Sequence, residues 1–284
     1  MKEWRSSPVP VKCLPGHLMI WRRNAGKEEN MQINYYKEYS PSLGRDMEFK
    51  SYGWAGKPIL YIPCQDGRFY DFENFGMDNV LAGRIEAGQV QVFSVDTIDR
   101  ETWSALGGDC RWRLERQEQW FHYVTDELVP RIHEINDRRG IWNAGPGIMT
   151  FGCSMGAQHA ANFFFRRPDL FDRNLSLSGL YDTRYSFGDY TDDLTFANSP
   201  IAFLDKMPDD HPWMERYRWN KCVICVGQGA WEDEMLDGTR RLNEVVRRRG
   251  IPVWVDFWGS DVNHDWPWWY KQAEYFLPFL LDER

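Results

Sequence analysis

The stretch "FGCSMGAQHAANFFFRRPDLF", residues 151–171, places a single serine between two glycines. The residues before it, "GIMTF", form an apolar run typical of a buried strand, and the small and aromatic residues after it suit a helix. A Gly-x-Ser-x-Gly sequence between a strand and a helix is typical of a strained turn that exposes its serine as a nucleophile, and the glycines leave room for that turn. We therefore predict that Ser154 is a nucleophile. The alternative is a plain turn in which the serine only caps the helix.

Strand and helix patterns alternate on both sides of this turn. Continuous apolar runs occur at 57–64, 89–96, 221–229 and 252–259, and helical patterns separate them at 79–88, 112–136, 156–167 and 238–250. This order predicts an α/β fold with a mostly parallel central sheet and helices on both faces. Alternating apolar residues in "HLMIWRR", "MQINYYKEYS" and "DMEFKSYG" predict antiparallel strands near the N-terminus.

The chain shows no internal repeat and no linker, so we expect residues 1–284 to form a single domain. The segment 183–220 is rich in Asp, Pro, Tyr and Trp and follows no clear period. We expect it to be an irregular insertion over the cleft.

Composition and charge exclude several classes of protein. The net charge of −8 leaves no broad basic field to replace phosphate counterions, so we expect no nucleic-acid partner. No apolar run reaches the eighteen residues of a membrane span, and residues 1–16 lack the apolar core of a signal peptide. We therefore expect a cytoplasmic protein that does not bind membranes.

The cysteines indicate neither a disulfide scaffold nor a metal site. Six of them, including Cys13, are scattered along 284 residues. Cys222 and Cys225 form a C-x-x-C, but they lie in the apolar run "KCVICVG", which predicts a buried strand with both thiols in the core. We predict no metal and no cofactor.

A serine nucleophile needs a base. His264, in "GSDVNHDWPWW", follows the last predicted strand and precedes the last helix. That loop opens at the carboxyl ends of the strands, at the same edge of the sheet as the serine turn. The order Ser, acid, His along the chain also requires the histidine last, so His264 is the predicted base.

The acid that holds the imidazole should come from a loop after an earlier strand. "CVGQGAWEDEMLD" supplies several carboxylates after the run at 221–226, and "SGLYD" supplies Asp182. We favour Asp233, with Glu232 second and Asp182 third.

Three stretches together, "GCSMGAQHAANFFFRRPDLF", "LSLSGLYD" and "NHDWPWW", resemble the esterase D-type branch of the α/β-hydrolases. This group includes S-formylglutathione hydrolases, feruloyl esterases and mycolyltransferases. The resemblance covers roughly residues 57 to 280 and implies an α/β-hydrolase fold, with Asp233 in the acid loop.

The resemblance also implies an oxyanion hole built from two backbone N–H groups. One belongs to Met155, directly after the nucleophile. The second should follow the first buried strand, where "YIPCQDGRFYDF" departs from the usual His-Gly or Asp-Gly-Leu turn. Aligning on Tyr61 makes Asp66 the donor, and aligning on "DG" makes it Arg68.

The sequence therefore predicts a serine hydrolase of small carboxylic esters that works through an acyl-enzyme. An acyltransferase using an alcohol in place of water, or a non-catalytic binding protein on the same fold, are the alternatives. We expect Trp231 and Trp266, which lie next to the proposed acid and base, to contact the substrate.

Overall fold

The computed structural model describes residues 18–21 and 31–283. Its described strands form one nine-stranded sheet in the order β1-β2-β3-β5-β4-β6-β7-β8-β9. β1, β2 and β3 pair antiparallel, β3 also pairs antiparallel with β5, and the strands from β5 to β9 run parallel. The strands are β1 (Leu18–Trp21), β2 (Gln32–Ser40), β3 (Arg45–Tyr52), β4 (Lys57–Ile62), β5 (Val90–Val95), β6 (Ile148–Cys153), β7 (Phe171–Leu177), β8 (Lys221–Val226) and β9 (Val253–Phe257). This confirms the predicted α/β fold and its antiparallel N-terminal strands.

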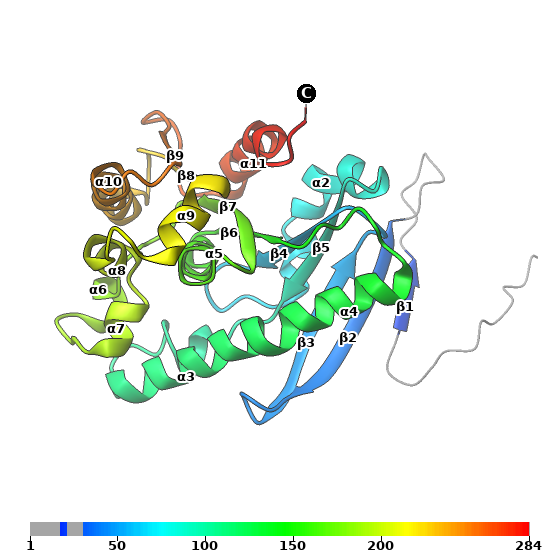
Figure 1. Ribbon diagram of the computed structural model, residues 1–284, viewed down its shortest axis with the longest axis horizontal. Coiled ribbons are helices and arrows are strands. Elements are labelled where there is room, and N and C mark those ends of the chain that lie inside the picture. Colours follow the sequence, from blue (N-terminus) through cyan, green and yellow to red (C-terminus); the bar gives the residue numbers. More distant parts are fainter. Residues whose placement is uncertain (1–17, 22–30, 284) are drawn as a thin grey trace, which may run out of the picture.

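Helices cover both faces of the sheet (Figure 1). Successive side chains of a parallel strand enter different cores, so these strands are rich in apolar residues. In β4, Ile59 and Tyr61 join the core under one set of helices, while Leu60 and Ile62 join the core under the other. The first set is α1 (Asp71–Asn74), α2 (Met77–Glu86) and α11 (Trp266–Leu280). The second includes α3 (Cys110–His122), α4 (Val129–Arg139), α5 (Met155–Arg166) and α10 (Asp233–Arg248).

The helix predicted at 112–136 is continuous but not uniform. A π-helical stretch, Tyr123–Leu128, joins α3 to α4. Pro130 stands in the first turn of α4 and has no N–H to donate to the preceding turn. A wider turn at this point accommodates the missing hydrogen bond.

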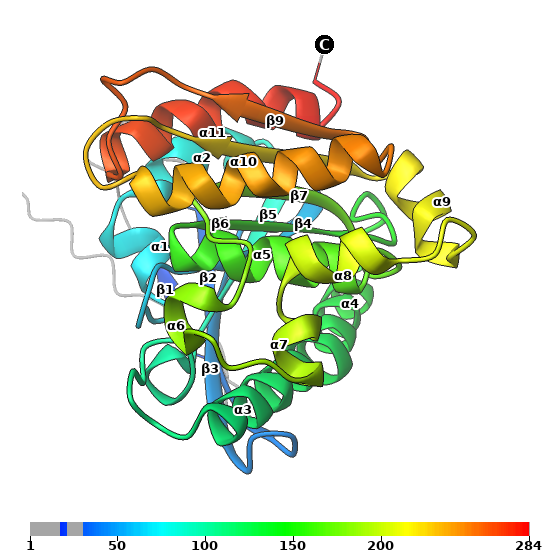
Figure 2. The same cartoon turned by 90° about the vertical axis from the view of Figure 1, so that its left-hand side faces the viewer.

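The segment 183–220 is largely helical, which corrects the expectation of an irregular insertion. It contains α6 (Arg184–Phe187), α7 (Asp193–Ala197), α8 (Pro200–Lys206) and α9 (Pro212–Trp219). Helices of four to eight residues are too short to show a hydrophobic period. Figure 2 shows α6, α7 and α8 between α3 and α10.

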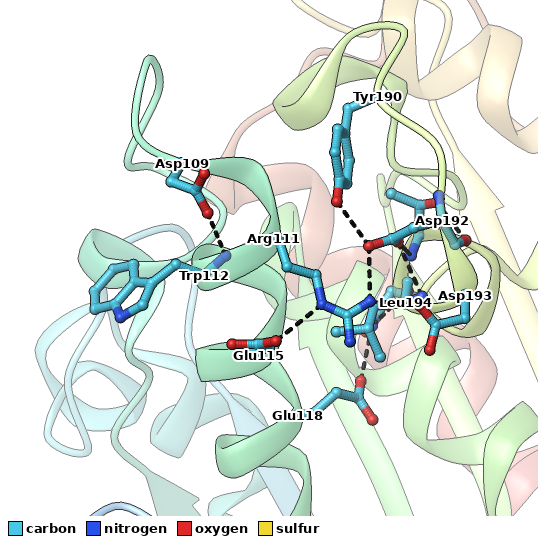
Figure 3. A network of polar contacts seen from close by, with 11 residues as sticks. Asp109, Arg111, Trp112, Glu115, Glu118, Tyr190, Asp192, Asp193 and Leu194 are labelled. Carbon is cyan, nitrogen blue, oxygen red and sulfur yellow. Dashed lines mark hydrogen bonds and ion pairs between the residues drawn. The ribbon is translucent and has the colours of Figure 1, made fainter.

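Polar contacts fasten this segment to α3 (Figure 3). Arg111 of α3 binds both Asp192 and Asp193, and Tyr190 donates a hydrogen bond to Asp192 at 2.9 Å. Asp192 in turn caps α7 through its side chain. One arginine thus ties the start of α3 to the start of α7.

The remaining sequence predictions concern the cysteines and the termini. Cys222 and Cys225 are free, buried thiols in β8, which confirms them as core residues. In the described part of the chain, no helix is long and apolar enough to cross a membrane. Cys13 and residues 1–16, used above to judge a signal peptide, lie outside the described residues.

Candidate active site

Ser154 stands at a sharp turn between β6 and α5, with φ of 56° and ψ of −127°. A positive φ is strained for a residue with a Cβ. Its N–H donates to the Leu177 carbonyl of β7 at 2.9 Å, which fixes the turn against the neighbouring strand. The serine therefore leaves the sheet at the carboxyl ends of the parallel strands, as its sequence context predicts.

The two flanking glycines are required by close backbone approaches. A Cβ on Gly152 would lie 2.3 Å from the Gly156 carbonyl group, inside the same turn. A Cβ on Gly156 would lie 2.2 Å from the Ile62 carbonyl oxygen at the end of β4. The glycines thus let the turn close and let α5 pack directly against the sheet.

His264 faces the serine. Its Nε2 lies 2.8 Å from Ser154 Oγ, although 110 residues separate the two in the chain. The histidine lies between β9 and α11, and its backbone N–H donates to the Ala230 carbonyl at 3.0 Å. The edge of the imidazole meets the Trp269 ring, with centroids 4.9 Å apart. The structure therefore brings together the predicted nucleophile and base.

The carboxylate beside the imidazole belongs to Glu232, which corrects the preference for Asp233. Glu232 Oε2 lies 3.3 Å from His264 Nδ1, and the glutamate is only 1% exposed. Trp231 adopts a left-handed φ of 65°, so the chain turns there and points the next side chain inward. Asp233 begins α10 and is exposed to solvent. Asp182, the third candidate, binds Arg184 and Arg241.

A second hydrogen bond holds the Glu232 carboxylate in place. Ser178 donates its hydroxyl to Glu232 Oε1 at 2.6 Å and accepts a hydrogen bond from Trp269 Nε1 at 3.1 Å. Ser178 itself has a φ of 56° and is fully buried at the end of β7. Both oxygens of the buried carboxylate therefore have a partner, as a buried charge requires.

Of the three residues predicted to supply oxyanion donors, Asp66 and Arg68 have backbone N–H groups that are already hydrogen-bonded. The Asp66 N–H donates to Asp99 Oδ2 at 3.1 Å, and the Arg68 N–H donates to Asp71 Oδ2 at 2.9 Å, so neither is available to a ligand. Gln65, directly before Asp66, lines the cavity at Ser154. Within the described chain, the N–H groups of Gln65 and Met155 have no protein acceptor.

A buried carboxylate–imidazole pair braces the loop that carries Gln65. Asp99 Oδ1 lies 2.8 Å from His159 Nε2 in α5, and both side chains are only 2% exposed. The edges of Trp103 and Trp120 enclose the imidazole. Because Asp99 also accepts the Asp66 N–H, it links the loop after β4 to the helix after Ser154.

A cavity of about 290 Å³ opens above Ser154 and His264. Trp231, predicted to contact the substrate, lines this cavity with 82% of its surface exposed. Trp266 does not line it, because its ring stacks on Phe75 with centroids 4.7 Å apart. The other lining residues are Gln65, Met155, Gln158, Leu180, Tyr185, Glu234 and Met235.

Several of these lining residues were not predicted from the sequence. Gln158 lies four residues after Ser154, so helical spacing alone places it on the face that carries the serine. Tyr185 comes from α6, which has no sequence period, and no signal in the chain connects it to the site.

Two cysteines adjoin the site but are not nucleophiles. Burial raises the pKa of the Cys64 thiol to about 12. Burial also raises the pKa of Cys153, which directly precedes Ser154, well above its ordinary value. Because only the thiolate attacks, we do not expect these buried thiols to compete with the serine hydroxyl.

Comparisons with known proteins agree with this geometry. The family described as "Putative esterase" matches residues 40–274. Among solved structures, a ferulic acid esterase is similar with a TM-score of 0.67 at 15% identity, over 89% of this chain and 98% of that one. An S-formylglutathione hydrolase from Agrobacterium tumefaciens also gives a TM-score of 0.67, at 12% identity over 93% of this chain and 98% of that one.

A third structure is a fluorophosphonate-binding serine hydrolase from Staphylococcus aureus, with a TM-score of 0.64 at 13% identity over 88% of this chain and 98% of that one. No curated protein sequence matches the chain. At these identities the structural likenesses support the α/β-hydrolase fold.

Proposed function

The chain belongs to the Esterase family of carboxylic-ester hydrolases, and we propose that it cleaves small esters through a triad of Ser154, His264 and Glu232. The observation that carries this proposal is the 2.8 Å contact between His264 Nε2 and Ser154 Oγ at a strained turn. A histidine within hydrogen-bond reach of a serine can remove its proton as the serine attacks.

In the first half of the reaction, Ser154 Oγ attacks the ester carbonyl carbon and His264 Nε2 takes the hydroxyl proton. The carbonyl oxygen becomes an oxyanion, which the N–H groups of Met155 and Gln65 stabilise together with the positive end of α5. His264 then gives the proton to the alcohol oxygen, which leaves. The acyl group stays on Ser154.

In the second half, water attacks the acyl-enzyme. His264 Nε2 removes a proton from the water, the acid leaves, and Ser154 recovers its proton. Glu232 stabilises the imidazolium in both halves and holds the Nδ1 proton. Its 3.3 Å contact is longer than an optimal charged hydrogen bond, and we expect it to shorten when the imidazole becomes charged.

The test is hydrolysis of p-nitrophenyl acetate by the wild type and by Ser154→Ala. The variant removes only a hydroxyl, so it should fold normally while kcat falls by about 10³-fold or more. An unchanged melting temperature is the control. Comparable turnover by the two proteins would overturn the proposal.

A further inference from the structure

The described lining of the cavity above Ser154 carries a negative charge but no lysine or arginine. No lysine or arginine is among its described lining residues, whereas Glu234 contributes a carboxylate from the first turn of α10. Glu234 is exposed and has no cationic partner within the described chain. Arg184, directly before Tyr185 in the chain, is bound to Asp182, and Arg241 of α10 is bound to Asp182 and Asp237. The described lining of the cavity therefore offers a carboxylate that has no ion-pair partner.

Two aromatic rings stand open beside this carboxylate. Trp231 is 82% exposed and Tyr185 is 59% exposed, and both line the same cavity. Neither ring packs on another aromatic ring or on a cationic side chain of the described residues. The faces of an open indole and an open phenol attract an ammonium group through cation–π interactions. An unpaired carboxylate attracts it through its opposite charge.

Trp231 also lies next in the chain to the residue that holds the backbone of His264, the proposed general acid. His264 must protonate the departing alcohol oxygen, and its backbone N–H is bonded to Ala230, directly before Trp231. The proposed oxyanion donors, Met155 and Gln65, come from different elements, the start of α5 and the loop after β4. We therefore place the alcohol part of the substrate toward Trp231 and Glu234.

We infer that the alcohol part of the substrate carries a positive charge, a quaternary or protonated ammonium group, recognised by Trp231, Tyr185 and Glu234. This inference rests on the proposed esterase function. An anionic alcohol or thiol would meet Glu234 without any basic side chain to offset the repulsion. The ester bond is cleaved by the same two steps as above, and the ammonium group takes no part in them.

Acetylcholine and 3,3-dimethylbutyl acetate test this directly, because they have the same shape and differ in the charge on the alcohol. We expect the wild type to show a kcat/KM for acetylcholine about tenfold or more above that for the neutral ester, which corresponds to about 1.4 kcal/mol of cation–π and charge attraction. Glu234→Gln and Trp231→Ala should each reduce this ratio severalfold. Added salt should reduce the wild-type ratio as well.

Glu244→Gln is the matched control. Glu244 is an exposed carboxylate on the same helix, ten residues or about 15 Å beyond Glu234, so its loss removes the same net charge away from the cavity. This variant should keep the wild-type ratio. A wild-type ratio near one, or a ratio that Glu234→Gln leaves unchanged, would overturn the inference.

Failure of the inference is distinguishable from failure of the proposed function. If the wild type hydrolyses the neutral ester and Ser154→Ala does not, the esterase proposal stands whatever the charge ratio. If p-nitrophenyl acetate is hydrolysed and neither of these two esters is, only the inference is overturned. If none of the three esters is hydrolysed, both proposals are overturned.

Discussion

The Glu232 carboxylate is the buried acid beside His264. It holds His264 through one oxygen and Ser178 through the other. A carboxylate in this position keeps the imidazole in the tautomer that accepts the serine proton, and it stabilises the imidazolium that forms. Its neighbour Asp233 points to solvent and can do neither.

Glu232→Gln should therefore reduce kcat by about 10²–10⁴-fold, because the amide no longer fixes the correct tautomer. Asp233→Asn, a change of the same kind one residue away, should keep kcat near the wild-type value. Steady-state kinetics with p-nitrophenyl acetate measures both variants. A large loss in Asp233→Asn with little loss in Glu232→Gln would reverse the assignment.

The residues of this site differ in how far the sequence predicts them. Ser154 and His264 could be predicted because strand, turn and chain order each constrain a single residue. Glu232 and Asp233 are adjacent carboxylates, and the choice between them depends on the left-handed turn at Trp231. A tryptophan rarely adopts that conformation, so composition gives no sign of it.

A buried pair, Asp99 and His159, supports the loop after β4 that carries Gln65. Asp99 accepts hydrogen bonds from the Asp66 N–H and from His159, and thereby fixes the peptide that presents Gln65. Asp99 and His159 are positioning residues, since neither lines the cavity at Ser154. The sequence could not exclude Asp66 as an oxyanion donor, because its N–H is taken by Asp99 from a distant part of the chain. The Arg68 N–H is taken by Asp71, three residues further on.

Asp99→Asn should lower kcat about tenfold while leaving KM nearly unchanged. The amide cannot accept both hydrogen bonds, so the loop loosens, and an oxyanion donor acts mainly in the transition state. Steady-state kinetics and thermal melting are measured on the same preparation. A lower melting temperature with wild-type kcat would show that the pair serves stability alone.

The helices of 183–220 are fixed to the body of the protein through Glu118. This residue of α3 binds Arg166 of α5 through both carboxylate oxygens, at 2.8 and 2.6 Å. It also accepts a hydrogen bond from Asn198, which follows α7, at 2.8 Å. Figure 3 shows Glu118 beside the Arg111 contacts.

Glu118→Gln should lower the free energy of unfolding by about 1–3 kcal/mol, because it weakens hydrogen bonds to a charged and largely buried partner. Glu115→Gln, on the exposed side of the same helix, should cause a smaller decrease since it loses only a surface contact with Arg111. Urea denaturation compares the two. Equal losses would show that the link through Glu118 adds no more than a surface ion pair.

The whole molecule is organised by a sheet buried on both faces. Much of the strand pattern could be predicted from the sequence because β4, β6 and β8 are largely apolar runs. The short helices could not, since their positions depend on packing against α3 and α10. Cys222 and Cys225 illustrate the strand pattern, because they lie on opposite faces of β8 and pack in different cores.

Because both thiols of the C-x-x-C are buried, we expect neither of them to react in the native protein. Burial raises the pKa of Cys222 to about 12 and also raises the pKa of Cys225, so neither forms a reactive thiolate near neutral pH. Iodoacetamide at pH 8 should label half-exposed Cys110 in the native protein and leave both β8 cysteines unmodified until denaturant is added. Peptide mass spectrometry checks each site. Native labelling of Cys222 or Cys225, or a disulfide between them, would contradict this packing.

The central claim is that the turn between β6 and α5 presents Ser154 as an activated nucleophile. Intact-protein mass spectrometry after treatment with a fluorophosphonate probe tests it most directly, because the probe reacts covalently with activated serines. The account predicts one adduct per chain, located on Ser154 by peptide mapping and absent from Ser154→Ala. An unlabelled wild type, or equal labelling of Ser154→Ala, would contradict it.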